Sequence, residues 1–337
     1  MKKMLLTLIC ILALAGLTLP GLIGAWLPGQ VEESLEQNWP DATSVIERSW
    51  FSSSVMAQRG NSRLNLKFQH FRWWRGALLD GVGQLELDQP EARIELSVQF
   101  GLKGQLLINA DSDRIRWPGI ETNQVDRIEL ALELQRNHQG GMSVSADAVR
   151  LADPYSNELE LRSIKINSNW QNNSEDLRRL WLDVYAQRPD QPASRLQLTT
   201  SSIEPEALNQ LTSALSELNR APPESLQAQM AGLGLVSAWQ QLVQAGLKFD
   251  LHELLLDRQV DIRGSWQPNQ QWLILLGGGY TPTALDWLGP ILGLNQGIAP
   301  EQARQQVWLW MQDASTHSLM TLHGEHFELD TSKADTP

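Results

Sequence analysis

Between Thr43 and Ser201 the sequence alternates apolar and polar residues with a period of two, the pattern of β-strands that bury one face. The alternation is clearest in three runs, at 64–68, 94–100 and 128–134. Turn-forming clusters rich in Gly, Pro, Asn and Asp separate the runs, and no helical pattern of about a dozen residues lies between them. Consecutive antiparallel strands joined by hairpins are therefore expected, rather than a parallel sheet with crossover helices.

The alternation also assigns each side chain to one face of the sheet, because neighbours along a strand point to opposite sides. Charged residues occupy many polar positions, so that face stays hydrated. The apolar face has to be covered by the curvature of the sheet, by later helices or by something that binds. The residues expected to be buried are Ile94, Leu96, Leu130 and Leu132, and those expected to be exposed are Glu95, Glu129 and Glu133.

After Ser201 the pattern changes, and apolar residues recur at steps of three and four, as in helices with one apolar stripe. Pro222-Pro223 separates the first two predicted helices. The elements expected in this part are helices at 204–218 and 224–245, a hairpin at 249–266 with its turn at Asp257-Arg258-Gln259, a strand at 272–276, helices at 284–292 and 300–314, and a strand pair within 319–329.

The segment from Pro300 is predicted to be a helix rather than a strand, because Pro300 with Glu301 and Gln302 makes a favourable first turn. Trp308 then lies at the margin of the apolar stripe, where it is available to a ligand, a partner or a bilayer surface. The stripe expected to pack on the sheet consists of Ala303, Val307, Trp310 and Ala314.

Before the strands, the 23 residues from Met4 to Trp26 carry no charge. At about 1.5 Å per residue this run is long enough to span a hydrocarbon core of about 30 Å. An uncleaved membrane anchor is expected; a cleaved signal at Ile23-Gly24-Ala25 and a lipoprotein at Cys10 are the alternatives. Lys2 and Lys3 place the amino terminus in the cytoplasm and the bulk of the chain in the periplasm, with a single pass through the inner membrane.

The composition after the anchor excludes several classes of function. With 25 basic and 39 acidic residues this part has a net charge of −14, which argues against nucleic acid or an anionic membrane surface as a partner. It contains no cysteine, so disulfides, thiolate nucleophiles and cysteine metal sites are impossible there. His317, His323 and His326 do not have the spacing of a shared metal site. No catalytic, cofactor or metal motif is found, and a non-enzymatic protein is expected.

Two short segments carry a family resemblance. The first is Arg48-Ser49-Trp50-Phe51-Ser52-Ser53, and the second is Gly246-Leu247-Lys248-Phe249, which leads into the predicted hairpin. They resemble segments of the YdgA-like bacterial proteins of unknown function, in which Gly usually stands at the position of Ser49. Turns such as Trp74-Arg75-Gly76 give a looser likeness to AsmA-like envelope proteins and to the accessory N component of type II secretion. The resemblance implies an inner-membrane-anchored periplasmic protein and supplies no catalytic residues.

The expected organisation is α+β: an N-terminal transmembrane helix and then a large, curved, mainly antiparallel sheet with a few helices in the C-terminal half. The regions expected are the anchor (1–27), a short stalk (28–42), a β-rich region (43–201), an α+β region that continues or covers the sheet (202–330) and a disordered tail (331–337).

Aromatic residues give the candidate contact sites, because Trp is rarely found at exposed strand positions. They are either part of a two-sided core or part of an apolar groove that binds a lipid, an envelope polymer or a membrane-protein partner. An accessory role in secretion or envelope assembly, or an enzyme without a known motif, are the alternatives. The candidate contact residues are Trp50, Trp73, Trp74 and Trp308.

Overall fold

The computed structural model describes most of the chain after Pro40. The described residues are 41–49, 51–72, 76–117, 123–135, 139–174, 177–220, 225–270, 272–317 and 319–331. The predicted anchor, nearly all of the predicted stalk and the predicted tail beyond Thr331 lie outside them, as do Trp50, Trp73 and Trp74. Among the described helices, none is long and apolar enough to cross a membrane.

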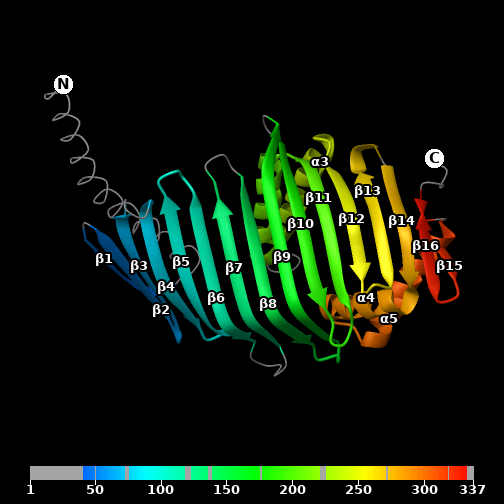
Figure 1. Cartoon of the computed structure of the whole chain (residues 1–337), viewed down its shortest axis with the longest axis horizontal. Helices are drawn as coiled ribbons and strands as arrows, with labels where there is room; N and C mark the ends of the chain where they lie inside the picture. Colours follow the sequence, from blue (N-terminus) through cyan, green and yellow to red (C-terminus); the bar gives the residue numbers. More distant parts are fainter. Residues whose placement is uncertain are drawn as a thin grey trace. The chain divides into compact units, whose positions relative to one another are not determined.

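The described strands form one antiparallel sheet of sixteen strands whose spatial order nearly follows the chain (Figure 1). Only the last pair departs from this order, because β14 pairs with β16 and β15 forms the edge. The large antiparallel sheet and the α+β class are confirmed. The first eight strands are β1 (Thr43–Arg48), β2 (Ser52–Arg59), β3 (Ser62–Arg72), β4 (Ala77–Leu87), β5 (Glu91–Gly101), β6 (Leu106–Arg116), β7 (Gln124–Leu134) and β8 (Gly140–Ala152). The others are β9 (Glu158–Ser174), β10 (Leu177–Gln187), β11 (Ala193–Ile203), β12 (Lys248–Leu256), β13 (Val260–Gln267), β14 (Trp272–Tyr280), β15 (Thr321–His323) and β16 (His326–Asp330).

The chain divides into two compact units. Unit 1 comprises Met1–Arg136 and Met142–Ala148, and unit 2 comprises Asn137–Gly141 and Val149–Pro337. Strand β8 contributes residues to both units. Strands alternate with turns as far as Ile203, and all the described α-helices follow Glu204.

In unit 1 the predicted assignment of side chains to faces is confirmed, because Leu96 pairs with Ala110 and Ala110 pairs with Leu130 on its other side. These residues share one face of the sheet. Within its described residues unit 1 contains strands and turns but no helix, so its predicted core leucines are half-buried rather than buried. The half-buried residues are Ile94, Leu96, Leu130 and Leu132; Glu95 and Glu129 are exposed, and Glu133 is half-buried.

The small core of unit 1 lies on β2, β3 and β4, where Val55, Phe68 and Leu79 are buried. Glycines in β4 make room for it. A Cβ at Gly81 would lie 2.6 Å from the Phe68 ring, and one at Gly83 would lie 2.3 Å from a Leu66 methyl group. The Phe68 and Leu66 side chains therefore lie over the glycine positions of β4. They cover the apolar face at this strand.

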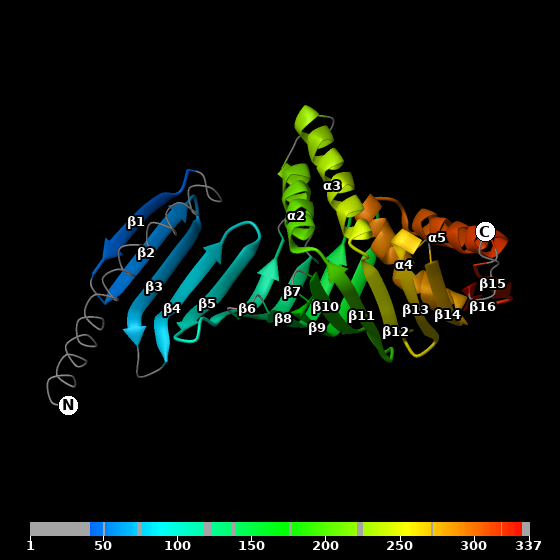
Figure 2. The ribbon, with the colours of Figure 1, turned by 90° about the horizontal axis from the view of Figure 1, so that it is seen from above.

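Unit 2 adds four α-helices to its strands, and Figure 2 shows them on the same side of these strands. The helices form two hairpins, α2 with α3 and α4 with α5 (Figure 2). The hairpin between β12 and β13 is confirmed with its turn at Asp257–Gln259, where Asp257 and Arg258 have positive φ. The helices are α2 (Pro205–Arg220), α3 (Leu226–Gln244), α4 (Thr281–Gln296) and α5 (Pro300–Thr316), with a short 3-10 helix η2 (Pro268–Gln270).

Two hydrophobic clusters hold the helices of unit 2 to its strands. The first joins the start of α2 and the end of α3 to β11, through Ile203, Ala207 and Leu242. The second joins α4 and α5 to β13 and β16; its buried residues are Val260, Ala284, Met311, Phe327 and Leu329.

Gly277, Gly278 and Gly279 lie inside β14, which extends beyond the strand predicted at 272–276. Neighbouring backbones are too close for side chains. A Cβ would lie 2.0 Å from the Asp261 carbonyl oxygen at Gly277, and 2.3 Å from the Phe327 carbonyl oxygen at Gly278. These glycines allow β13 and β16 to pack closely on the two sides of β14.

The helix predicted from Pro300 is confirmed, but its predicted stripe is partly wrong. Ala303 and Val307 are buried as expected, whereas Trp310 is 52% exposed and Met311 is buried in its place. The buried positions recur at steps of four, so the contact line follows Ala303, Val307 and Met311 along the helix. Trp310 therefore faces solvent.

The core of α5 can be tested with two truncations on the same helix. Val307→Ala removes two methyl groups from a side chain that is 1% exposed, and we expect a loss of about 2 kcal/mol in the free energy of unfolding. Trp310→Ala should change it by less than about 0.5 kcal/mol. Urea unfolding of both variants measures the difference, and a larger loss for Trp310→Ala would show that the helix is rotated from this orientation.

Candidate functional site

The apolar face of unit 1 is the first candidate surface. Directly paired residues on neighbouring strands point to the same side, so the register builds four rows of side chains, of which three cross β3 to β7 and one crosses β3 to β5. Nearly all the members of these rows are apolar. The four rows are Leu64, Leu85 and Ile94; Leu66, Gly83, Leu96, Ala110 and Leu130; Phe68, Gly81, Val98, Ile108 and Leu132; and His70, Leu79, Phe100, Leu106 and Leu134.

This apolar face, defined by the four rows, is about 19 Å wide across five strands and about 20 Å long, because strands lie about 4.8 Å apart and residues rise about 3.3 Å each. Its flat area is on the order of 400 Å², the size of the largest apolar patch on a typical monomer, which is often functional. Most of its side chains from β5 to β7 are half-buried, and Phe100 is 37% exposed. Nothing in the described part of unit 1 covers these three strands.

The opposite face of unit 1 is charged and contains a groove of about 800 Å³. Its carboxylates and guanidinium groups are mixed, and Arg114 donates a hydrogen bond of 3.1 Å to Asp126 beside it. In the described residues no group of three His, Cys, Asp or Glu side chains is arranged to hold a metal ion. The groove is lined by Glu86, Glu91, Ala92, Arg93, Glu95, Asp111, Ser112, Asp113, Arg114 and Arg116.

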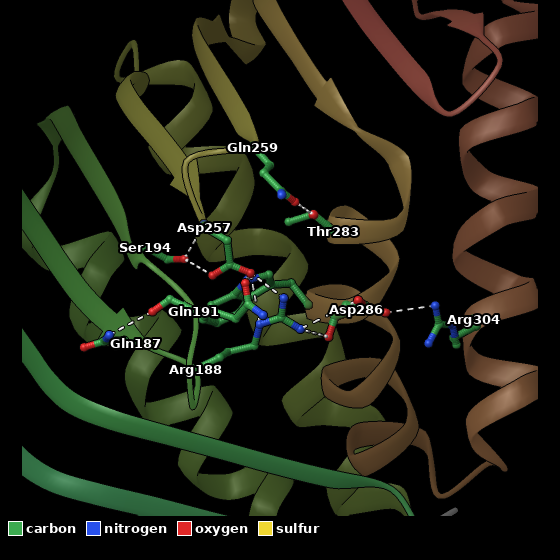
Figure 3. A network of polar contacts seen from close by, with 10 residues as sticks. Gln187, Arg188, Gln191, Ser194, Asp257, Gln259, Thr283, Asp286 and Arg304 are labelled. Carbon is green, nitrogen blue, oxygen red and sulfur yellow. Dashed lines mark hydrogen bonds and ion pairs between the residues drawn. The ribbon is translucent and has the colours of Figure 1, made fainter.

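Unit 2 contains a buried polar network centred on Asp257, which is 1% exposed (Figure 3). Arg188, in the loop between β10 and β11, donates two hydrogen bonds to one carboxylate oxygen of Asp257. Trp287 of α4 donates a third to the same oxygen at 3.0 Å. Ser194 donates to the other oxygen at 3.1 Å and accepts a hydrogen bond from the Asp257 amide at 2.8 Å.

The network continues from Arg188 toward α5 (Figure 3). The Arg188 guanidinium lies 5.3 Å from the centre of the Trp287 ring and 4.0 Å from the Asp286 carboxylate. Asp286 also pairs with Arg304 of α5 at 2.8 Å. A surface depression of about 490 Å³ beside these residues is lined by Arg188, Asp286 and Arg304 together with residues of the loop before β9.

The geometry makes this network a structural clamp. Asp257 is 1% exposed and both its carboxylate oxygens accept hydrogen bonds, so the group is kept from contact with a substrate or a metal ion in solvent. A buried carboxylate is tolerated only when it is paired and hydrogen-bonded in this way. The network therefore joins the β10–β11 loop, the β12–β13 turn and α4 at one end of the strands.

A second group of buried hydrogen bonds lies beside the same depression. Asn157, which is 1% exposed, donates one hydrogen bond of 2.7 Å to the Ile298 carbonyl oxygen and another of 2.7 Å to Asp153. Burial acts to raise the pKa of Asp153, but hydrogen bonds from the Asn157 side chain and from the Asn157 and Tyr155 amides lower it below its ordinary value. The loop between β8 and β9 is thereby fixed to the α4–α5 junction.

The structure places one predicted contact residue, Trp308, in its described part. It packs half-buried against the cluster that contains Val260 and Met311, so it lies at the margin of the core as predicted. Contact of Trp308 with a ligand stays a prediction. The more exposed aromatic side chain on this helix is Trp310.

Some features of these sites could not be found in the sequence. Asp257 was recognised as a turn residue, but its burial depends on Arg188, which is distant in the sequence. His323 and His326 lie opposite each other on β15 and β16, a pairing that their sequence spacing does not reveal. No protein-family model, curated protein or solved structure matches the chain. The resemblance to the YdgA-like family therefore stays a prediction.

The clamp can be tested by removing its cation. Arg188→Ala leaves the Asp257 carboxylate buried without its charged partner, and we expect a loss of about 3–5 kcal/mol in the free energy of unfolding. The matched control is Arg263→Ala, because Arg263 is exposed and pairs with exposed Asp261 at 3.4 Å. The control should lose less than about 0.5 kcal/mol. Equal losses in urea unfolding would contradict the clamp.

Acid sensitivity of unit 2 can be tested at Asp183 of β10. Hydrogen bonds from the Arg195 side chain hold the pKa of Asp183 below 3.8, more strongly than partial burial raises it. Because the pKa of Asp183 is lower in the folded than in the unfolded state, the ionised carboxylate stabilises the fold. This stabilisation is complete at pH values above the ordinary pKa of 3.8, and it is lost as the pH falls through the folded-state pKa. In acid unfolding, Asp183→Asn should be less stable than the wild type at neutral pH, and the difference should shrink in acid; a constant difference would contradict the linkage.

Proposed function

We propose that this protein is a non-enzymatic, inner-membrane-anchored periplasmic protein that binds lipid acyl chains on the apolar face of unit 1. The observation that supports the proposal most strongly is the part of this face on β5, β6 and β7 that no described residue of unit 1 covers. Water is a poor solvent for such a surface, and an apolar ligand gains roughly 25 cal/mol for each Å² that it covers.

The dimensions of the apolar face suit acyl chains. Half of a hydrocarbon core of about 30 Å is about 15 Å, the depth of one leaflet, and the rows extend about 20 Å along the strands. Val98, Ile108 and Leu132 form a central row without a polar side chain. Methylene groups need no hydrogen-bond partner, so an acyl chain can pack on this row without leaving a polar group unpaired.

The same chemistry is less suited to the other predicted ligands. A polysaccharide needs hydrogen-bond partners, and a protein interface usually has Tyr, Trp or Arg side chains at its centre. The described rows contain only aliphatic side chains, glycines, two phenylalanines and His70 at one end. An acyl chain is therefore preferred over an envelope polymer or a membrane-protein partner.

The predicted anchor supports a lipid ligand in a second way. A tether at 1–27 would keep unit 1 close to the bilayer from which lipids are taken. A role as an accessory component in envelope assembly is compatible with lipid binding, and the binding itself is the claim to test.

A photoactivatable phospholipid tests the proposal in membranes that contain the full chain. Val98→Glu places a charge in the central row, and we expect labelling of β5–β7 peptides to fall at least tenfold, because burial of an unpaired carboxylate against an acyl chain is costly. Mass spectrometry of the labelled peptides gives the readout.

The matched control is Val82→Glu. Val82 is 60% exposed on the charged face and pairs with Ser97, the neighbour of Val98. Because the same side chain is introduced on the opposite face, labelling should stay at the wild-type level. Equal labelling of Val98→Glu and Val82→Glu in folded protein would refute lipid binding at this face.

A further inference from the structure

The hairpin of α2 and α3 has an apolar outer stripe. On α3 the residues Leu226, Met230 and Leu233 recur at steps of four and three, and they are 75%, 61% and 66% exposed. The inward side of α3 is made by Ala231, Ala238 and Leu242, roughly 120–160° around the helix from this stripe. Helix α3 therefore has apolar residues on its inner side and on its outer side.

Only the base of the hairpin is fixed to the strands. Trp239 of α3 stacks on Trp266 at 6.0 Å between ring centres, and Trp266 stacks on Phe249 at 5.2 Å. The cluster at Ile203 and Leu242 lies at the same level. Figure 2 shows the far ends of both helices pointing away from the strands of unit 2.

The far end is also apolar on α2, where Leu215 and Leu218 are 43% and 37% exposed. Charge is absent from α3, which has no charged residue in its 19 positions, whereas the sequence around the end of α2 contains Glu217, Arg220 and Glu224. A helix that is apolar on both its inner and its outer side is normally covered on both.

We propose that the outer face of the α2–α3 hairpin is a self-association surface, on which two copies of the chain pair to form a four-helix bundle. Two antiparallel helices with an apolar outer stripe are half of such a bundle, and a twofold axis brings identical stripes together. Each Leu226–Met230–Leu233 stripe then packs against the hairpin of the other copy.

Charge favours a second copy over other partners. Interfacial membrane helices usually have Lys and Arg on their polar side, whereas the polar residues of α3 are Gln and Ser. The part after the anchor has a net charge of −14, so two copies repel except where the surface is uncharged. Of the two helices of this hairpin, α3 offers such a surface.

The size of the surface is sufficient for a dimer. A helix of 19 residues is about 28 Å long, and two helices side by side are about 20 Å wide. The face is on the order of 500 Å² per copy, or about 1,000 Å² in total, which is the lower limit for a stable biological interface.

Cysteine cross-linking in membranes tests the pairing with the full chain. In a Cys10→Ser background, Met230→Cys should form a cross-linked dimer with a short bismaleimide reagent. Gln305→Cys is the control, because Gln305 is exposed on α5, away from the hairpin. We expect at least tenfold more dimer for Met230→Cys than for Gln305→Cys.

Leu233→Glu, with the same cross-linking cysteine at position 230, provides the second measurement. Because Leu233 is exposed, the variant should keep its melting temperature and lose the dimer at least tenfold, and the protein mass in detergent should halve. Self-association is overturned if Met230→Cys gives no dimer, if it cross-links only to another protein, or if a bilayer quencher places position 230 in lipid.

Discussion

A single β-sheet has two faces, and its apolar face must be kept from water. The alternation in this chain makes one face apolar along strand after strand, so each unit needs a cover. Unit 2 supplies its own cover with four α-helices, whose contacts bury Val260, Met311 and Leu242. The described part of unit 1 supplies no helix, and Phe68 and Leu66 cover only the glycine positions of β4. The proposed function follows from this difference.

Polar contacts in unit 2 determine where its helices lie. The buried Arg188–Asp257 pair, with Trp287 and Ser194, fixes α4 to the β10–β11 loop and to the β12–β13 turn. Asn157 fixes the β8–β9 loop to the α4–α5 junction. Such a network adds little net stability, but losing one member leaves a buried charge or polar group unpaired. It therefore favours one arrangement of helices over others that would bury similar apolar area.

Local patterns predicted most of the described elements. Strand alternation identified the sheet and the side chains that share its faces, and the turn at Asp257–Gln259 and the start of α5 at Pro300 were placed correctly. The errors concern contacts between distant residues. On α5 the buried residue is Met311 and not the predicted Trp310. In β14 the glycines are sites of close strand packing. Periodicity gives the positions along an element that share a face, but it does not tell which face finds a partner. The outer stripe of α3 is the clearest example.

Native mass spectrometry of the full chain, extracted from its own membranes in mild detergent, tests the central claim most directly. We expect the intact protein to carry phospholipid that survives removal of the detergent, and the Val98→Glu variant to lose it while Val82→Glu retains it. Wild-type protein that is folded and free of lipid would contradict the account, and so would equal lipid retention in the two variants.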